Sequence, residues 1–445
     1  MKFKTTPLKL GKTALTTAKR LKKTASIAGL SALRVAKGEK ADAWLLKESF
    51  EQLGTTYIKL GQFIASTPSL FPKEYVTAFA DCLDNTTPVR FEVIKSVLEE
   101  ELAVMGGTQA VFSFIDPTPL ASASIAQVHK AVLTTGETVA LKIQKPEVGT
   151  IIHTDLGVLH STFWAMEKVL PSFKMTNLAP IVEEIKARMM AETDFVQESQ
   201  HLKNFQAFLE KTSNHQVTAP KVYDALTTKR LLTMEFFDGV SLASEDALSA
   251  ILNNPHTNPN DVMSTVLDTW FLSLLMTGEF HADLHAGNLL LLKDGRVGFL
   301  DFGLVGQIDP NSLKACLLLT QAMSQNDFLM MANAMIDIGM TKDRQHIDPV
   351  VLAEDLKSLL SIGSPIKDRL NQNSPKDAKA HAQNHAKEFN ILMAQMASIG
   401  KKHGIHFPRD FALLTKQLLY FDRFMVTLAP EMDMFSGSRL QLLQS

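Results

Sequence analysis

Apolar residues recur with a helical period near the start of the chain. From Ala43 to Thr67 they lie three and four residues apart, which predicts one helix over this segment. Gly61 lies inside it. A mid-helix glycine costs about 1 kcal/mol relative to alanine, so we expect another backbone to approach closely there. Pro72 begins a second predicted helix that ends near Asn85, and residues 88–103 predict a third.

The pattern becomes strand-like after Pro119. Residues 123–133, the turn TTGET and residues 139–144 predict a hairpin of two strands, which Pro146 ends. Residues 221–239 predict two further strands, closed by an Asp-Gly turn.

The rest of the pattern is mainly helical. Helices are predicted over residues 155–212 and from Ser264 onward, interrupted by a mixed segment at 280–304. Residues 370–390 are polar and predict a linker or a solvated helix. No apolar run reaches the ~18–20 residues of a membrane span. The most apolar run, TWFLSLLMTG, therefore predicts a core helix.

Composition narrows the class of protein. The chain has 445 residues, 45% hydrophobic and 21% charged, which favours a globular protein with a large core and two or three domains or lobes. Two distant cysteines, Cys82 and Cys316, exclude a CxxC zinc site and a disulfide framework and fit a reducing compartment. No secretory signal is recognisable, so we expect a cytoplasmic protein.

Charge is unevenly distributed. Residues 1–38 hold ten Lys and Arg and no acid, whereas the remainder holds 35 Lys and Arg against 47 Asp and Glu. Such a segment fits a solvated, partly disordered tail, a contact with an anionic membrane surface such as the inner membrane, or a contact with acidic partners. A mitochondrial transit peptide is a further alternative. Nucleic acid is not expected, because no aromatic residue beyond Phe3 interleaves with the basic ones.

The segment HADLHAGN carries the sharpest chemical signal. Asp283 and Asn288 have the separation of base and metal ligand in the kinase pattern H-R-D-L-x-x-x-N, and His281 occupies the histidine position. Asp301 follows a predicted strand and begins a D-F-G segment. A Mg²⁺ ion held by Asn288 and Asp301 would bridge phosphate oxygens. Two roles are open for His285: it orients the loop, or it packs as a hydrogen-bonded side chain.

Lys142 ends the apolar run VALK and is expected to contact the α- and β-phosphates of ATP. Such a lysine needs a carboxylate to hold it. Glu192, Asp194 and Glu198 are candidates, and spacing alone does not choose among them. Residues 234–237, MEFF, are similar to a hinge whose backbone hydrogen-bonds adenine, with an ordinary edge strand as the alternative.

Upstream of Lys142 the chain lacks the glycine-rich loop of protein kinases. The same register holds Ala121, Ala123 and Ala126. Alanine restricts φ and adds a Cβ, so we expect a stiffer segment over the phosphates.

These motifs together resemble the UbiB family of atypical kinase-like proteins, also called aarF-domain proteins, from about Glu48 to Phe435. The resemblance rests on a KxGQ motif at 59–62, an alanine segment at 121–124, an ExD motif at 192–194, and the HADLHAGN and DFG segments. It implies that Glu198 is the partner of Lys142. Ser122 stands where the family usually has alanine and places a hydroxyl near the phosphates.

The resemblance implies an α+β, two-lobed kinase-like fold with a helical extension over the active site. It implies an ATPase or phosphotransferase that binds Mg²⁺ and ATP and supports isoprenoid quinone (ubiquinone) biosynthesis or lipid handling at a membrane, with quinone-pathway lipids or enzymes as partners. The C-terminal apolar anchor of bacterial ubiquinone-pathway members is not expected here. A nucleotide-gated scaffold or lipid chaperone is the main alternative, and a small-molecule phosphotransferase is a weaker one because those enzymes lack KxGQ.

The expected domains are a basic tail (1–42), a helical KxGQ extension (43–118), a kinase-like N-lobe with inserted helices (119–240) and a helical C-lobe (241–445). The expected site residues are: catalytic, Asp283, Lys142 and Glu198; metal-binding, Asn288 and Asp301; nucleotide-binding, Ala121, Ser122, Ala123, Ser124, Lys142, Glu235 and Phe237; family motifs, Lys59, Gly61, Gln62, Glu192 and Asp194.

Overall fold

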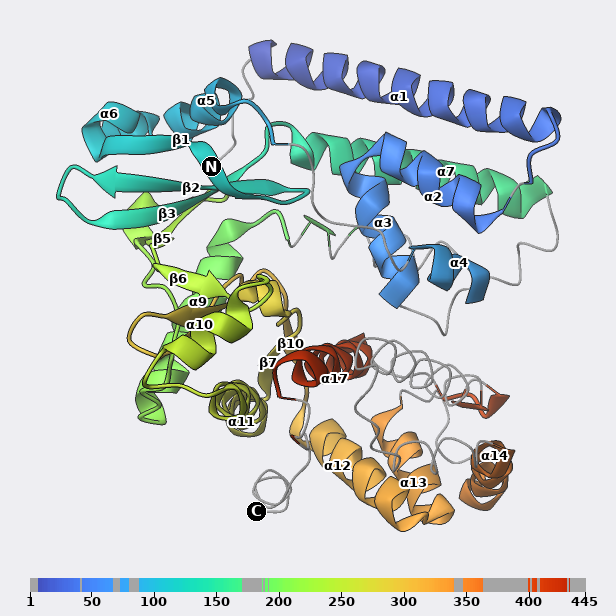
Figure 1. The fold of residues 1–445 in the computed structure, drawn as a ribbon. Coiled ribbons are helices and arrows are strands. Elements are labelled where there is room, and N and C mark those ends of the chain that lie inside the picture. Colours follow the sequence, from blue (N-terminus) through green and yellow to red (C-terminus); the bar gives the residue numbers. More distant parts are fainter. Residues whose placement is uncertain are drawn as a thin grey trace. The chain divides into compact units, whose positions relative to one another are not determined.

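The structure is a computed structural model and forms two compact units (Figure 1). Unit 1 is Met1–Gln200 with Lys221–Phe236, and unit 2 is His201–Pro220 with Phe237–Ser445. The residues described are 7–40, 42–66, 73–79, 88–169, 186, 189–190, 192–339, 347–362, 399–400, 402–405, 409–429 and 432. The polar segment 370–390 and the end of the helix predicted to stop near Asn85 lie outside them.

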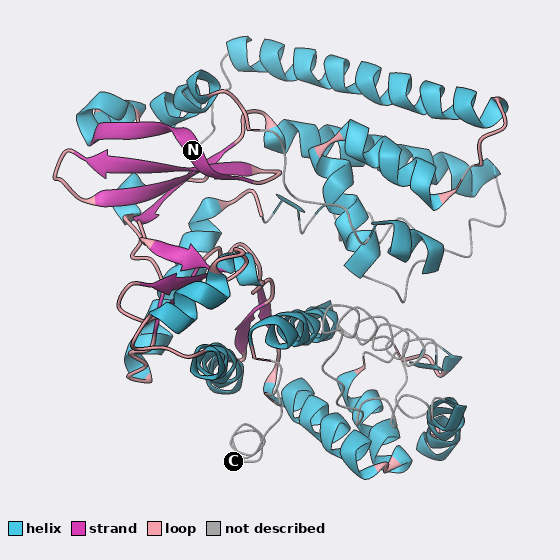
Figure 2. Ribbon diagram, in the orientation of Figure 1, coloured by secondary structure: helices cyan, strands magenta, loops and turns pink. Residues whose placement is uncertain are grey.

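Unit 1 contains a four-stranded antiparallel sheet in the order β1-β2-β3-β5 (Figure 2). Its strands are β1 (Phe112–Ser122), β2 (Ala126–Leu133), β3 (Thr138–Gln144) and β5 (Leu231–Glu235). The predicted hairpin is confirmed as β2 and β3, and Gly136 has φ 98° in the turn between them. Helix α5 (Phe91–Glu101), the third predicted helix, buries Ile94 and Leu98 in the core of this sheet. The short elements η1 (Ala103–Met105) and α6 (Thr108–Val111) follow it.

Strand β1 is not foreseen by the sequence, which assigns most of it to the helical extension. Pro117 and Pro119 interrupt the strand pattern, because proline has no N–H for the ladder. The structure places β1 at the edge of the sheet, where proline is tolerated. The register against β2 shifts on both sides of Pro119, so the strand also bulges there.

Only one of the two strands predicted over residues 221–239 is present. β5 forms, but the residues before it make a single bridge at Val222 and the 3₁₀ turn η3 (Asp224–Leu226). Thr228 explains the difference, since its hydroxyl accepts hydrogen bonds from the backbone of Arg230 and Leu231 at 3.2 Å each. Such local bonds compete with a strand ladder.

The helices of unit 1 share a second core. They are α1 (Pro7–Ala36), α2 (Ala43–Leu53), α3 (Thr55–Ser66), α4 (Lys73–Phe79) and α7 (Val148–Val169). The single helix predicted from Ala43 to Thr67 is wrong, because the chain breaks at Gly54, whose φ of 93° favours glycine. Asp42 caps α2 by accepting hydrogen bonds from the N–H groups of Trp44 (3.1 Å) and Leu45 (3.0 Å).

The basic N-terminal segment is helical where it is described. Arg20 on α1 donates from Nε and Nη2 to the two carboxylate oxygens of Asp155 on α7, each at 2.6 Å. Asp155 is fully buried, and Ile27 buries the same face of α1. The alternative of a disordered tail is therefore wrong for residues 7–36.

Unit 2 contains two small sheets and most of the remaining helices. One sheet has the order β4-β9-β8-β6, and the other pairs β7 with β10. The strands are β4 (Val217–Thr218), β6 (Gly239–Ser241), β7 (Glu279–His281), β8 (Leu289–Leu292), β9 (Val297–Phe299) and β10 (Val305–Gln307). The helices are α10 (Ala247–Asn253), α11 (Pro259–Thr277), η4 (Ala286–Asn288), α12 (Pro310–Gln325), α13 (Phe328–Ile338), α14 (Pro349–Ile362) and α17 (Arg409–Leu428). Helix α9 (Phe195–Lys211) begins in unit 1 and continues into unit 2.

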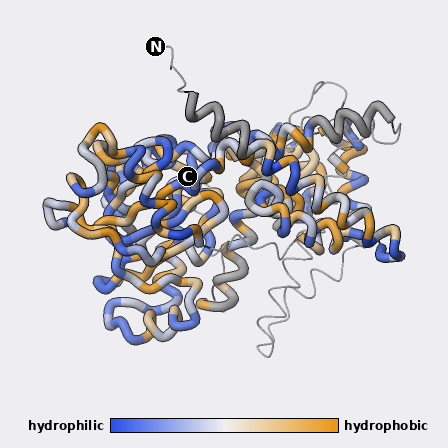
Figure 3. Tube along the Cα trace, turned by 90° about the horizontal axis from the view of Figure 1, so that it is seen from above, coloured by the Kyte–Doolittle hydropathy of each residue, from blue (hydrophilic) through white to orange (hydrophobic). Residues whose placement is uncertain are grey.

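Helix α11 contains the run TWFLSLLMTG up to Thr277, with Gly278 as its C-cap, and is the core helix that the sequence predicts. Trp270 is 1% exposed and contacts Phe271, Phe280 and Phe421 edge-on, with ring centroids 5.1–5.7 Å apart. Among the helices that the structure describes, none is long and apolar enough to cross a bilayer. Figure 3 shows hydrophobic and hydrophilic residues alternating along most elements, as expected where one face of an element is buried.

Candidate functional site

Lys142 lies in the middle of β3 and pairs with Glu198 in the first turn of α9. Its Nζ lies 2.7 and 2.9 Å from the two carboxylate oxygens. The side chains are 12% and 4% exposed, so the ion pair is nearly shielded from water. Of the three acids that spacing leaves open, the structure therefore brings Glu198 to Lys142. The part that this pair plays in nucleotide binding stays a prediction.

The other two acids contact different partners. Glu192 lies 3.1 Å from Nζ of Lys59 on α3, so the ExD and KxGQ motifs meet through an ion pair. Asp194 caps α9 by accepting from the N–H of Val196 at 3.1 Å, and it also contacts Lys229 at 3.2 Å. Gly61 is buried in α3, and the side chain of Gln62 lies outside the described part of the chain.

The alanine segment ends β1 and turns into β2. The N–H of Ala123 donates to the carbonyl of Ala126 at 2.9 Å, which closes the turn tightly. Ala121 is a register partner of Val128, which is a partner of Lys142, so these three side chains share one face of the sheet.

Ser122 instead shares the opposite face with its partner Gln127. Its Oγ is buried and has no hydrogen-bond partner among the described residues. The sequence expects this hydroxyl near the phosphates. In the structure Ser122 lies on the face away from Lys142, because adjacent strand residues alternate sides. Ser124, after the strand, is buried.

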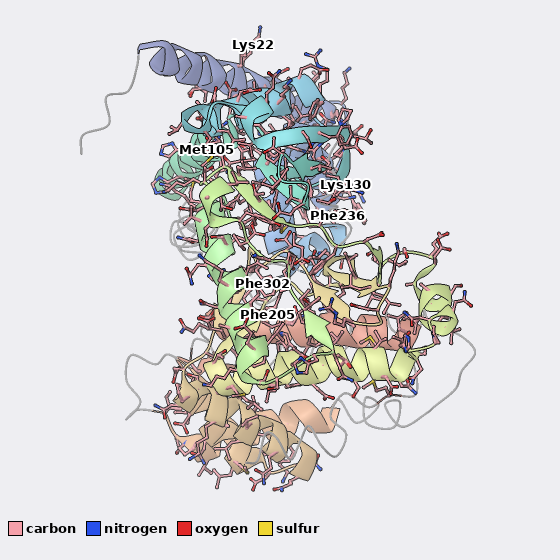
Figure 4. All side chains as sticks on the ribbon, turned by 90° about the vertical axis from the view of Figure 1, so that its left-hand side faces the viewer. Lys22, Met105, Lys130, Phe205, Phe236 and Phe302 are labelled. Carbon is pink, nitrogen blue, oxygen red and sulfur yellow. The ribbon has the colours of Figure 1, made fainter. Side chains whose placement is uncertain are left out.

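Residues 234–237 span the boundary between the two units. The N–H of Phe236 donates to Thr138 at 3.4 Å, and Lys130 Nζ lies 4.5 Å from the centroid of its ring (Figure 4). Exposed Glu235 donates its N–H to the carbonyl of Lys221 at 2.8 Å. Phe237 belongs to unit 2, where a Cβ added at Gly298 would lie 2.9 Å from its ring. Phe236 and Phe237 are consecutive, but Phe236 packs in unit 1 and Phe237 packs in unit 2.

His281 organises the start of the HADLHAGN loop. Its Nδ1 accepts from the N–H of Asp283 at 3.2 Å, so Nε2 carries the proton and donates to Leu300 O at 3.1 Å. Burial lowers the pKa of His281, which favours this neutral tautomer. The Nδ1 of His285 accepts from the N–H of Gly287 at 3.0 Å, which makes His285 the cap of η4.

Asn288 and Asp301 are tied to the same loop. The side-chain nitrogen Nδ2 of Asn288 donates to Asp283 O at 3.0 Å, and the backbone carbonyl of Asn288 accepts from the N–H of Leu300 at 2.9 Å. Asp301 has φ 52°, a left-handed conformation that is uncommon outside glycine. Its Oδ1 accepts from the N–H of Gly303 at 3.2 Å.

Phe302 anchors the DFG segment. It is 1% exposed, and its ring centroid lies 4.9 Å from that of Phe205 (Figure 4) and 4.8 Å from that of His281. Its carbonyl lies 3.1 Å from Nδ1 of His201. Packing of Phe302 therefore fixes the backbone that directly follows Asp301.

Sequence reasoning misses two residues that contact the loop. Trp270 Nε1 donates to His281 O at 2.9 Å, and Gln417 binds the backbone of Leu284 twice. Gln417 lies far from the kinase-like motifs in the sequence, and the local pattern does not mark it. Trp270 lies in the predicted core helix, 11 residues before His281, but that prediction does not include a contact with the loop. In the described part of the chain, no group of three His, Cys, Asp or Glu side chains could hold a metal ion.

A family model of the ABC1 atypical kinase-like domain matches residues 81–335. The chain belongs to this family. The family model and the relative described below confirm the resemblance found from the sequence, and the two-lobed kinase-like fold is confirmed with it. Membership in the ABC1 family makes this an atypical kinase-like protein and indicates nucleotide binding in general terms.

Two relatives cover most of the chain. An uncharacterized aarF domain-containing protein kinase of Arabidopsis thaliana, named as chloroplastic, is 40% identical over 406 residues, covering 89% of this chain and 74% of its own. An uncharacterized Mycobacterium tuberculosis protein is 29% identical over 398 residues, with 89% and 76% coverage. A solved structure of a Mycobacterium tuberculosis protein in complex with erythromycin aligns with a TM-score of 0.48 and 21% identity, covering 84% of this chain and 90% of its own.

Proposed function

We propose that the protein is an atypical kinase-like ATPase that binds MgATP and transfers or hydrolyses its γ-phosphate in support of lipid or isoprenoid quinone metabolism at a membrane surface. The observation that carries the proposal is the bidentate contact of Lys142 with Glu198 at 2.7 and 2.9 Å. A lysine held this way presents its charge at a fixed position, which suits the α- and β-phosphates of ATP. The link to quinones rests on the family resemblance of the KxGQ motif.

The oxygen donors of unit 2 fit Mg²⁺. Carboxylate and amide oxygens are hard ligands of the kind that this ion prefers. Because the side-chain nitrogen of Asn288 donates to Asp283 O, the side-chain oxygen is the atom that would ligate a cation. With Asn288 and Asp301, the bound ion would neutralise charge on phosphate oxygens.

Asp283 is the residue proposed to accept the proton of the attacking hydroxyl or water. A base in this position orients the nucleophile more than it activates it. The protonated Nε2 of His281 is directed to Leu300 O, so His281 holds the backbone of Asp283 and does not itself accept this proton.

Asp301→Asn tests the proposed binding of Mg²⁺. Removing one carboxylate charge should cut the gain in ATP affinity that Mg²⁺ provides by about tenfold, since an amide is a weaker Mg²⁺ ligand. Isothermal titration of ATP with and without Mg²⁺ measures this gain. Asp246→Asn is the matched control, because Asp246 is exposed and its side chain caps no helix N–H. An unchanged magnesium effect in Asp301→Asn would contradict the proposed site.

The proposed contact with a membrane involves the exposed side of α1. Lys19 and Lys22 are exposed there, as are the side chains of Leu30 and Leu33, and Figure 4 shows Lys22 projecting outward from the helix. Lys37, directly after the helix, is also exposed. Basic side chains near an anionic bilayer contribute about 1 kcal/mol each. We propose that this side of α1 contacts anionic lipid.

Lys19→Glu/Lys22→Glu is expected to reduce binding to anionic vesicles at low salt by tenfold or more, measured by co-sedimentation. Deleting residues 1–38 would be a poorer test, because it also removes the buried contacts of Arg20 and Ile27. Lys95→Glu/Lys211→Glu makes the same charge change at two exposed positions outside α1. Equal loss in both double variants would show that only net charge matters.

A further inference from the structure

The HADLHAGN loop is held by a residue far along the chain. Gln417, on α17, is fully buried. Its Oε1 accepts from the N–H of Leu284, and its Nε2 donates to the carbonyl of the same residue, both at 2.8 Å. Leu284 directly follows Asp283 and is itself fully buried. One side chain therefore satisfies both backbone polar groups of Leu284, the residue that follows Asp283.

Helix α17 is placed for this contact by its aromatic face. Phe421, one turn after Gln417, is fully buried, with its ring centroid 5.1 Å from that of Trp270. Trp270 donates its indole N–H to His281 O at 2.9 Å. The loop is thus held on both sides of Asp283, at His281 by α11 and at Leu284 by α17.

At neutral pH the chemistry of the contact favours a carboxamide. Among side chains in their usual protonation state at that pH, only asparagine and glutamine offer a donor and an acceptor side by side in the geometry of a peptide group, and asparagine is one methylene shorter. An apolar residue at 417 would leave a buried N–H and C=O without partners, each costing about 1–3 kcal/mol. The loop would relieve that cost by moving, and Asp283 would move with it.

We propose that Gln417 is a positioning residue that holds Asp283 in its working orientation. The inference rests on the proposed function, in which Asp283 orients the nucleophile. It assigns a role to a helix outside residues 81–335, the part of the chain that the family model matches. Small displacements of a reacting group lower rates steeply, and about 1 Å can cost on the order of 100-fold.

The first test compares Gln417→Leu with Gln206→Leu in the full chain. Gln206 is a matched control, because its Nε2 also donates to backbone carbonyls in unit 2, at Ala219 (3.1 Å) and Pro220 (2.8 Å), away from the loop. Both variants should lower Tm. Only Gln417→Leu should reduce kcat for ATP hydrolysis, by at least tenfold, with the Kd of MgATP within threefold of the parent. Equal kcat in the two variants would overturn the proposal.

A second variant covers the case in which Gln417→Leu does not fold. Gln417→Glu keeps the length and one accepting oxygen, and its protonated carboxyl can donate to Leu284 O as the amide does. The ratio of its kcat to that of the parent should therefore rise as pH is lowered. A ratio that stays flat with pH would contradict positioning through this hydrogen bond.

A third measurement does not depend on turnover. Hydrogen exchange of the peptide spanning residues 280–289 should be at least tenfold faster in Gln417→Leu and Gln417→Glu at neutral pH than in the parent and Gln206→Leu. Unchanged exchange would refute the inference. If the parent chain neither binds nor hydrolyses ATP, the proposed function fails, while the exchange result still decides whether Gln417 holds the loop.

Discussion

Arg20→Met should lower the free energy of unfolding by about 3–5 kcal/mol, the usual effect of removing one partner of a buried ion pair. Asp155 is fully buried and receives two hydrogen bonds of 2.6 Å from Arg20. Without the guanidinium, its carboxylate remains buried without that counter-charge. Methionine keeps the unbranched stem, so lost packing contributes little. Urea denaturation followed by circular dichroism measures the change.

Two further variants separate charge burial from helix loss. Arg34→Met lies on the same helix, but its partners Glu39 and Glu48 are 50% and 48% exposed, so little change is expected. Arg20→Met/Asp155→Leu removes both charges and should recover much of the stability, since an apolar pair can replace a buried ion pair. A double variant no more stable than Arg20→Met would show that α1 contributes through other contacts.

Lys142→Met should weaken MgATP binding on the order of 10- to 100-fold. A hydrogen bond to a charged group contributes about 1.5–3 kcal/mol, and the phosphates would lose one such contact. Isothermal titration measures the change in Kd. Lys221→Met is the control, because it makes the same substitution at an exposed lysine of unit 1. The Nζ of Lys221 lies 6.0 Å from the centroid of the Tyr223 ring, so this lysine, like Lys142, also has a contact to lose.

Lys142→Met also leaves Glu198 buried without its cation, so binding and stability must be distinguished. Lys142→Met/Glu198→Leu should recover stability without recovering affinity, because in the proposed site the lysine, and not the glutamate, contacts phosphate. If the double variant bound MgATP as tightly as the parent, the role of Lys142 would be structural. Thermal unfolding without nucleotide gives the stability comparison.

Local pattern predicts the parts of the fold that local chemistry decides. The β2–β3 hairpin and α5 follow from residue periodicity and from a glycine turn. Strand β1 could not be predicted in this way, because its two prolines interrupt the strand pattern and its place at the sheet edge depends on tertiary structure. Gly54 breaks a helix that periodicity alone continues, since apolar spacing carries no information about φ.

The same division applies to the candidate site. Motif spacing identifies Asp283, Asn288 and Asp301, because a short loop and hairpin hold them. It leaves the partner of Lys142 open among three acids, and the choice of Glu198 depends on how α9 begins, at the Asp194 cap. Gln417 lies 133 residues from Leu284, and no sequence period links the two.

The prolines of β1 have a consequence for how copies of the chain meet in solution. An exposed sheet edge offers unpaired N–H and C=O groups to any extended chain, and this is a common route to aggregation. At Pro117 and Pro119 that edge has no N–H to offer, and the register shifts around Pro119 bend it. Intermolecular strand addition is therefore disfavoured on this side of the sheet.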